Sequence, residues 1–329
     1  MPSGRSAIAP RLLVALWLLA SLDNVASGRK LAELCQSHAA YQWLCGDVAV
    51  NYHTLNDFRV GHDQALDELF TQVLGKLMHA GLVKVERICQ DGLRVRASAG
   101  SSSFKSKEKL GRCLQEAKAH LADLSRLRDE SPARGLEDIE GRKMRQAEDR
   151  IRRINAALEA CQEITERKQR EDDVKKRQRP ALASTTDADA RRMKMADGGF
   201  RPAYNVQIAS DPESRAIVGI QVTNRGGDAL LLTPMRQEVH RRTGKRPVEQ
   251  VADGGYVSLD NVNQATGENV TLYLPVPPAH HKDQDRFAPR AKDSEAVTKW
   301  RIRMGQAPAK EIYKQRTRTS ETINADLRT

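Results

Sequence analysis

The chain has 329 residues, 39% of them hydrophobic and 29% charged, a balance that predicts a globular protein with a sizeable buried core. Lys and Arg outnumber Asp and Glu by 54 to 43, and the resulting net charge of +11 favours a polyanionic partner, either DNA or an anionic membrane. Aromatic residues make up only 4%, which argues against a single-strand binder that stacks many bases and favours duplex DNA. The five cysteines form no Cys-x-x-Cys pair and have no matching histidine spacing, so we expect reduced thiols and no zinc site.

The N-terminus allows two interpretations. Arg5 and Arg11 precede an apolar run, and residues 25–28 resemble a signal-peptidase site, a pattern typical of an exported protein. The apolar run is shorter than the roughly 20 residues that span a bilayer, and no disulfide-like cysteine framework follows it. We therefore expect a buried helix after Pro10 in a cytoplasmic, nucleoid-associated protein, and keep an exported coiled-coil protein as an alternative.

The first half of the chain is predicted to be mostly helical. Residues 10–80 contain short helices, the clearest being 65–78, where apolar pairs recur every four residues. An alternating stretch, 83–89, predicts a strand that ends at Asp91. Residues 105–179 are densely charged with helical apolar rows, which predicts a helical hairpin that turns at 131–135.

The second half alternates between strand and helix patterns. Residues 204–209 and 216–223 predict a β-hairpin, followed by a helix over 229–242 with Asp228 as its N-cap. A short strand, 248–252, then ends at Asp253. Further elements are expected as a helix over 259–266, a strand over 271–276, a basic loop over 280–292 and a helix from Glu311.

Two aspartates at strand ends and a late helical glutamate form a candidate site: Asp91, Asp253 and Glu321. Hard carboxylate oxygens of this kind hold the two Mg²⁺ ions of many phosphoryl-transfer enzymes. Spacing alone is weak evidence, because the chain has 43 acidic residues and most acids lie on solvated faces.

Four stretches along the chain resemble DDE transposases of bacterial insertion sequences. They are 10–59, similar to a helical N-terminal domain; 90–98, with Asp91; 204–207 leading to 252–256, with Asp253; and 313–321, with Tyr313, Arg316 and Glu321. The resemblance implies an α+β fold with mixed α/β order: an RNase H-like core sheet flanked by helices. The implied domains are a helical N-terminal domain over 1–81 and a catalytic domain over 82–329, interrupted after its first strand by the charged insertion 105–180.

The implied function is transposition. Water would cut a phosphodiester at the element's end, and the freed 3′-hydroxyl would then attack target DNA, with two Mg²⁺ or Mn²⁺ ions held by Asp91, Asp253 and Glu321. Tyr313, Arg316, Arg94 and Arg328 are the expected DNA contacts. The implied partners are double-stranded DNA, at the element's ends and the target, and a second copy in a homodimer; no membrane is expected.

The chain departs from the family pattern in two places. Leu93 and Arg94 stand where relatives often have threonine and lysine, which retains the charge and loses a hydroxyl. Thr329 follows Glu321 by only eight residues, whereas relatives continue, so we expect a C-terminal truncation. The alternative function is a catalytically inactive truncated fragment that binds DNA and regulates or inhibits transposition.

Overall fold

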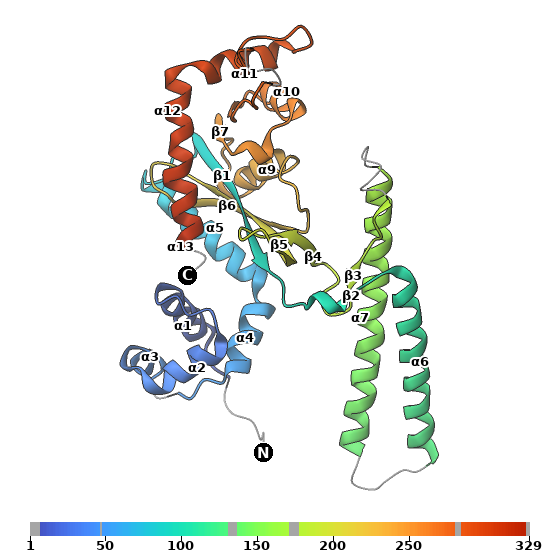
Figure 1. Ribbon diagram of the computed structural model, residues 1–329. Helices are drawn as coiled ribbons and strands as arrows, with labels where there is room; N and C mark the ends of the chain where they lie inside the picture. Colours follow the sequence, from blue (N-terminus) through green and yellow to red (C-terminus); the bar gives the residue numbers. More distant parts are fainter. Residues whose placement is uncertain (1–6, 47, 131–136, 171–177, 280–283, 327–329) are drawn as a thin grey trace. The chain divides into compact units, whose positions relative to one another are not determined.

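The computed structural model describes residues 7–46, 48–130, 137–170, 178–279 and 284–326 (Figure 1). The chain divides into two compact units, one of Met1–Lys84 with Glu321–Thr329 and one of Val85–Ser320. The turn expected at 131–135 lies outside the described residues.

Among its described residues, the first unit contains five N-terminal helices. They are α1 (Pro10–Leu22), α2 (Gly28–Ser37), α3 (Ala39–Cys45), α4 (Tyr52–Gly61) and α5 (Asp63–His79). The expected helix does begin at Pro10, whose missing N–H costs nothing at a first helical position. Leu16, Leu31 and Leu55, from three of these helices, are fully buried in one core. None of the described helices is both long and apolar enough to cross a membrane.

The second unit is built on a mixed sheet whose strands are paired in the order β4-β5-β1-β7-β8, with β6 also paired to β5. Its strands are β1 (Arg87–Arg96), β4 (Arg191–Lys194), β5 (Phe200–Ser210), β6 (Ile217–Thr223), β7 (Glu249–Val251) and β8 (Thr271–Tyr273). β1 runs antiparallel to β5 and parallel to β7, which is in turn parallel to β8. The predicted mixed α/β composition is therefore confirmed.

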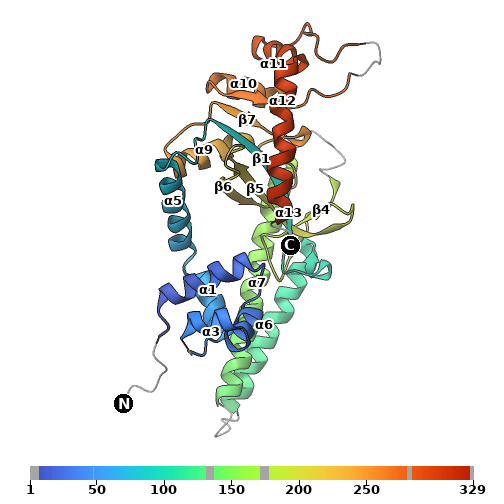
Figure 2. The same cartoon turned by 90° about the vertical axis from the view of Figure 1, so that its left-hand side faces the viewer.

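The helices of this unit follow the predicted order with one addition. They are α9 (Leu232–Thr243), α10 (Leu259–Gly267), α11 (Glu295–Gly305) and α12 (Ala307–Arg316), then the π-helical segment η3 (Thr317–Glu321); α13 (Thr322–Asp326) follows in the first unit. The helix α11 was not predicted from the sequence. Trp300 of α11 is fully buried in the largest core cluster and donates its indole N–H to the Leu274 carbonyl at 3.1 Å. Figures 1 and 2 show α12 running alongside β1.

The charged segment forms the expected pair of helices, α6 (Lys107–Glu130) and α7 (Glu137–Gln169). The two helices lie side by side in both views (Figures 1 and 2). At their base, β2 (Phe104–Lys105) pairs with β3 (Ala183–Ser184). The two helices share a core that includes Leu110, Ala117, Ile154 and Cys161. In each helix these residues are spaced so that they lie on the same face.

Candidate active site

Two parallel strands, β1 and β7, bring the segments that carry Asp91 and Asp253 side by side. Cys89 is paired with Val251, and each aspartate lies two residues further along its own strand direction. Asp91 stays within β1, whereas Asp253 lies in the turn that follows β7. The two carboxylates are close enough for the charge of Asp253 to raise the pKa of Asp91.

The prediction that Asp91 ends a strand is wrong. Asp91 lies in the middle of β1, where it is paired with Ile208 of β5, and the strand continues to Arg96. The Asp-Gly pair suggested a turn, but Gly92 stays extended because β5 continues beside it. What ends near Asp91 is only the parallel pairing with β7, at Cys89. Asp253 lies in the turn that begins where β7 ends, beside the part of β1 that carries Asp91.

Asp91 is a partly buried carboxylate in a mixed electrostatic environment. Burial is the main cause that raises its pKa, and the negative charges of Asp253 and Asp228 add to the increase. The backbone N–H of Gly92, which donates to Oδ1 at 2.8 Å, and Arg316, with Nη1 at 3.6 Å from Oδ2, act in the opposite direction. The net result is a carboxylate that is costly to ionise unless further positive charge is supplied.

Asp253 is held by the turn that follows β7. Its side chain caps the short 3-10 helix η2 (Gly254–Tyr256) and accepts from the Gly255 backbone N–H at 2.8 Å. A Cβ on Gly255 would lie 3.1 Å from the Asp253 Oδ1 and 3.5 Å from the Asp228 Oδ2. Asp253 and Asp228 therefore flank the same backbone position.

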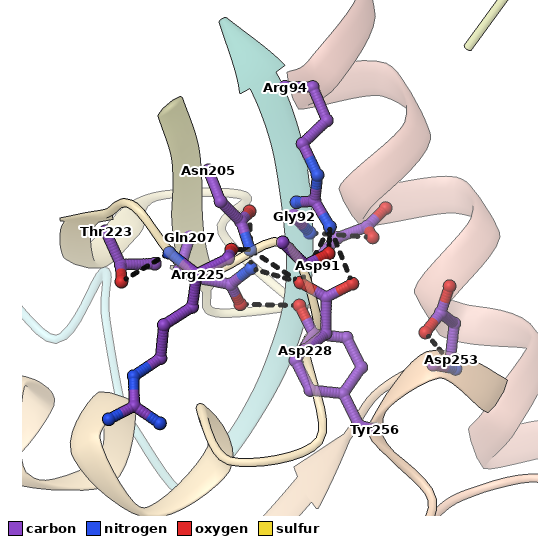
Figure 3. Close-up of polar contacts among 12 residues, drawn as sticks. Asp91, Gly92, Arg94, Asn205, Gln207, Thr223, Arg225, Asp228, Asp253 and Tyr256 are labelled. Atoms are coloured by element: carbon purple, nitrogen blue, oxygen red, sulfur yellow. Dashed lines mark hydrogen bonds and ion pairs between the residues drawn. The ribbon is translucent and has the colours of Figure 1, made fainter. Parts of the chain in front are cut away.

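Asp228 is the site residue that the sequence analysis missed. It was expected to cap α9, but the N-cap of α9 is Leu231, which makes no side-chain cap bond. The Asp228 carboxylate instead accepts from the Asn205 Nδ2 at 2.7 Å, the Gln207 Nε2 at 3.0 Å and the Arg94 Nη2 at 3.0 Å (Figure 3). The available signal was the alternation of Asn205 and Gln207 within an otherwise apolar strand, which places two amides on one face.

Tyr256 shows that the three aspartates surround one small region. Its hydroxyl donates to the Gln207 Oε1 at 2.5 Å, and its ring is buried. Burial, followed by the negative charges of the three aspartates, raises the pKa of Tyr256.

The other predicted residues have different surroundings. Arg316 contacts Asp91 and lies with its guanidinium 5.9 Å from the ring centre of Tyr313, which packs against the core. Arg94 is paired with Asp228. Glu321 is exposed at the last residue of η3, a π-helical turn of a kind that often marks functional sites. Arg328 lies outside the described residues.

The chemistry of the carboxylates suits a hard divalent cation. Asp91 and Asp253 offer oxygen ligands, which Mg²⁺ and Mn²⁺ prefer, and a bound cation would offset the burial and the neighbouring negative charges that raise the pKa of Asp91. Among the described residues, no group of three or more His, Cys, Asp or Glu side chains is arranged to hold a metal ion. The roles of Asp91, Asp253 and Glu321 as metal ligands therefore stay predictions.

Neighbouring carboxylates at the carboxyl side of parallel strands, with an arginine beside them, define a site of the kind that phosphoryl-transfer enzymes use. Family comparisons agree with this class. Residues 2–61 match the model described as "Transposase domain (DUF772)", and residues 167–327 match "Transposase DDE domain". No curated protein and no solved structure matches the chain significantly. The chain belongs to the DDE transposases of insertion sequences.

Asp91 precedes the residues matched by the DDE model, whereas Asp253 and Glu321 fall within them. The assignment of Asp91 to the site therefore depends on the strand register and on its contact with Arg316.

Proposed function

We propose that the protein is a transposase that cuts DNA at the ends of an insertion sequence and transfers the cut strands to target DNA, using Mg²⁺ or Mn²⁺. The observation that carries the proposal is the pair of aspartates, Asp91 and Asp253, each two residues beyond the paired residues Cys89 and Val251 of adjacent parallel strands, and close enough for the charge of Asp253 to raise the pKa of Asp91. Two neighbouring carboxylates repel each other, and Arg316 beside Asp91 does not fully offset this, because the pKa of Asp91 remains raised. Bound cations would remove the repulsion.

Asp91 and Asp253 would hold the metal ions, with Glu321 as a further ligand. When bound, two such ions activate the attacking oxygen and stabilise the leaving oxygen of an in-line displacement. Arg316 keeps a positive charge beside Asp91, in a position to contact a DNA phosphate near the carboxylates. Tyr313, Arg94 and Arg328 are proposed as further DNA contacts.

An RNase H-like core is proposed from the strand order. Taken in chain order, the first three long strands, β1, β5 and β6, form an antiparallel succession, and β7 and β8 continue the sheet on the other side of β1 in parallel. On this basis we propose the catalytic domain as 82–329, with 105–180 as an insertion, and 1–81 as a separate helical domain.

The distribution of charge supports a DNA partner outside the helical hairpin. α6 and α7 together carry 14 Lys and Arg against 13 Asp and Glu, whereas the whole chain has a net charge of +11. Nearly all of the positive excess therefore lies in the rest of the chain, where it favours phosphate contacts. The proposal includes action on DNA in the cytoplasm, at the nucleoid, by a homodimer that joins two element ends.

The direct test is nicking of a duplex that contains this gene's own flanking DNA, in the presence of Mg²⁺ or Mn²⁺. The matched pair of variants is Asp253→Asn and Asp260→Asn, because Asp260 is an exposed aspartate in the first turn of α10. We expect cleavage at defined ends by the wild type and by Asp260→Asn, and none by Asp253→Asn. Salt-sensitive duplex binding without cleavage by the wild type would contradict the proposal and favour a non-catalytic DNA-binding protein.

A further inference from the structure

The ion pair between Arg94 and Asp228 is more strongly constrained than a usual surface pair. The two side chains are only 18% and 21% exposed, and their atoms are 3.0 Å apart. Arg94 also donates from the same nitrogen, Nη2, to the Gly226 carbonyl at 3.0 Å. An exposed ion pair has little orienting power, because both side chains remain mobile; this pair is fixed at both ends.

Asp228 is itself held by a buried network of amides. Its Oδ1 accepts from Asn205 and Gln207. Two donors on the side away from Asp228 fix the orientation of the Gln207 amide: its Oε1 accepts from the Tyr256 hydroxyl at 2.5 Å and from the Gln90 Nε2 at 2.8 Å. With that oxygen engaged, the Gln207 amide nitrogen faces the other side, where it donates to the Asp228 Oδ1 and to the Asn205 Oδ1.

The network extends through the sheet. The Gln90 Oε1 accepts from the Gln250 Nε2 at 2.7 Å, and the Gln250 Oε1 accepts from the Arg236 Nη1 at 2.7 Å. Gln90, Gln207 and Gln250 are all completely buried. A fully satisfied buried polar network is rigid, because any rotation leaves a donor or acceptor unpaired in a low dielectric.

The Arg94–Asp228 pair lies directly beside the two proposed metal ligands (Figure 3). A Cβ on Gly92, the neighbour of Asp91, would lie 3.2 Å from the Arg94 Nη1. A Cβ on Gly255 would lie 3.5 Å from Asp228 and 3.1 Å from Asp253. All of the hydrogen bonds described for Arg94 use Nη2, which leaves its Nη1 edge for a further acceptor.

We propose that Arg94 binds a DNA phosphate next to the carboxylates and that Asp228 is its positioning residue, which turns the guanidinium so that one edge faces Asp228 and the other faces the phosphate. This inference rests on the proposed function, since it assigns a task at the same site. Guanidinium groups held in this way recognise phosphate through paired N–H donors, which a lysine lacks. The three side chains that donate to the Asp228 carboxylate hold it in one orientation, which suits a positioning role.

The test is duplex binding measured by fluorescence anisotropy at several salt concentrations, without divalent ions so that no strand is cut. Plain electrostatics predicts that removing a negative charge near DNA strengthens binding. The positioning role predicts the opposite for Asp228→Asn: affinity weaker by about fivefold to tenfold, and a slope of log K against log salt reduced by about one, as for loss of one phosphate contact. Arg94→Gln should give the same result, and the double variant should bind no more weakly than either single one.

Asp197→Asn is the matched control, because Asp197 is paired with Arg201 at 2.6 Å in an exposed turn of the same unit. It should bind DNA as tightly as the wild type or more tightly. Tighter binding by Asp228→Asn would overturn the proposal. Arg94→Lys provides a second, independent test if Asp228→Asn does not fold: wild-type affinity in Arg94→Lys would show that charge alone matters, whereas a loss equal to that of Arg94→Gln supports the fixed guanidinium. Because binding is measured without cleavage, a protein that fails to nick DNA leaves this test intact.

Discussion

Replacing Asp91 by asparagine is expected to stabilise the metal-free protein while abolishing cleavage. Burial and the neighbouring carboxylates raise the pKa of Asp91, so its ionised form is a net cost to the folded state at neutral pH. Like charges that lie within the range of about 4–6 Å over which neighbours shift a pKa repel by roughly 1–4 kcal/mol for effective dielectric constants of about 20–80. Loss of the 3.6 Å contact with Arg316 offsets part of this gain. We expect a net gain of about 1 kcal/mol, which corresponds to a rise in Tm of about 2–4 °C for a unit of this size.

The gain should depend on pH in a defined direction. A carboxyl group whose pKa is raised by folding is penalised above its folded pKa, and the penalty disappears below its unfolded pKa of about 3.9. The difference in Tm between Asp91→Asn and the wild type should therefore be largest at pH 7–8 and shrink as the pH falls towards 4. Calorimetry across this range measures it, and Mn²⁺ should stabilise only the wild type.

Asp197→Asn serves as the control for these measurements. The Arg201 side chain, which donates to Asp197, lowers the pKa of this exposed carboxyl to about 2. Its contribution to stability is present above the unfolded pKa and is lost as the pH falls, so Asp197→Asn should not gain stability at pH 7. A lower Tm for Asp91→Asn than for the wild type at pH 7–8 would refute the claim that the ionised Asp91 carboxylate lowers the stability of the folded protein.

Three further substitutions test the packing around the site. Gly92→Ala places a Cβ 2.6 Å from the Gln207 Nε2; we expect a loss of about 1–3 kcal/mol in denaturant unfolding together with slower nicking, and an unchanged midpoint would contradict the close approach. Tyr256→Phe removes the hydroxyl that donates to Gln207 and should cost about 1 kcal/mol in the same assay; no loss would mean that the hydrogen bond contributes nothing. Trp300→Ala empties a fully buried site and should cost about 3–5 kcal/mol, read as a fall in Tm; a surface-like effect under about 0.5 kcal/mol would contradict its burial.

The sequence predicted the elements of the second unit better than the geometry of its site. The β-hairpin of β5 and β6, the strand before Asp253 and the helix ending at Gly244, whose φ of 69° closes α9, all follow from local patterns of alternation and capping. These signals depend only on neighbours in the chain. The early helices were predictable for the same reason.

The parts that sequence reasoning missed depend on contacts between distant segments. Asp91 lies inside a strand because β5 pairs with residues beyond it, and no local pattern reports a partner more than a hundred residues away. Asp228 was expected to be a helix cap because its local context after two glycines is typical of one. Its actual partners come from β1 and β5, and only the folded sheet brings them together.

The measurement that tests the central claim most directly is cleavage by an Asp91→Cys variant with Mg²⁺ and with Mn²⁺. A thiolate is a poor ligand for Mg²⁺ and a better one for softer ions. If Asp91 binds the metal, the variant should lose cleavage with Mg²⁺ and recover part of it with Mn²⁺, while the wild type cuts the same duplex ends with both ions. Equal cleavage by the variant and the wild type in Mg²⁺ would contradict a metal-binding role for Asp91 and, with it, the proposed site.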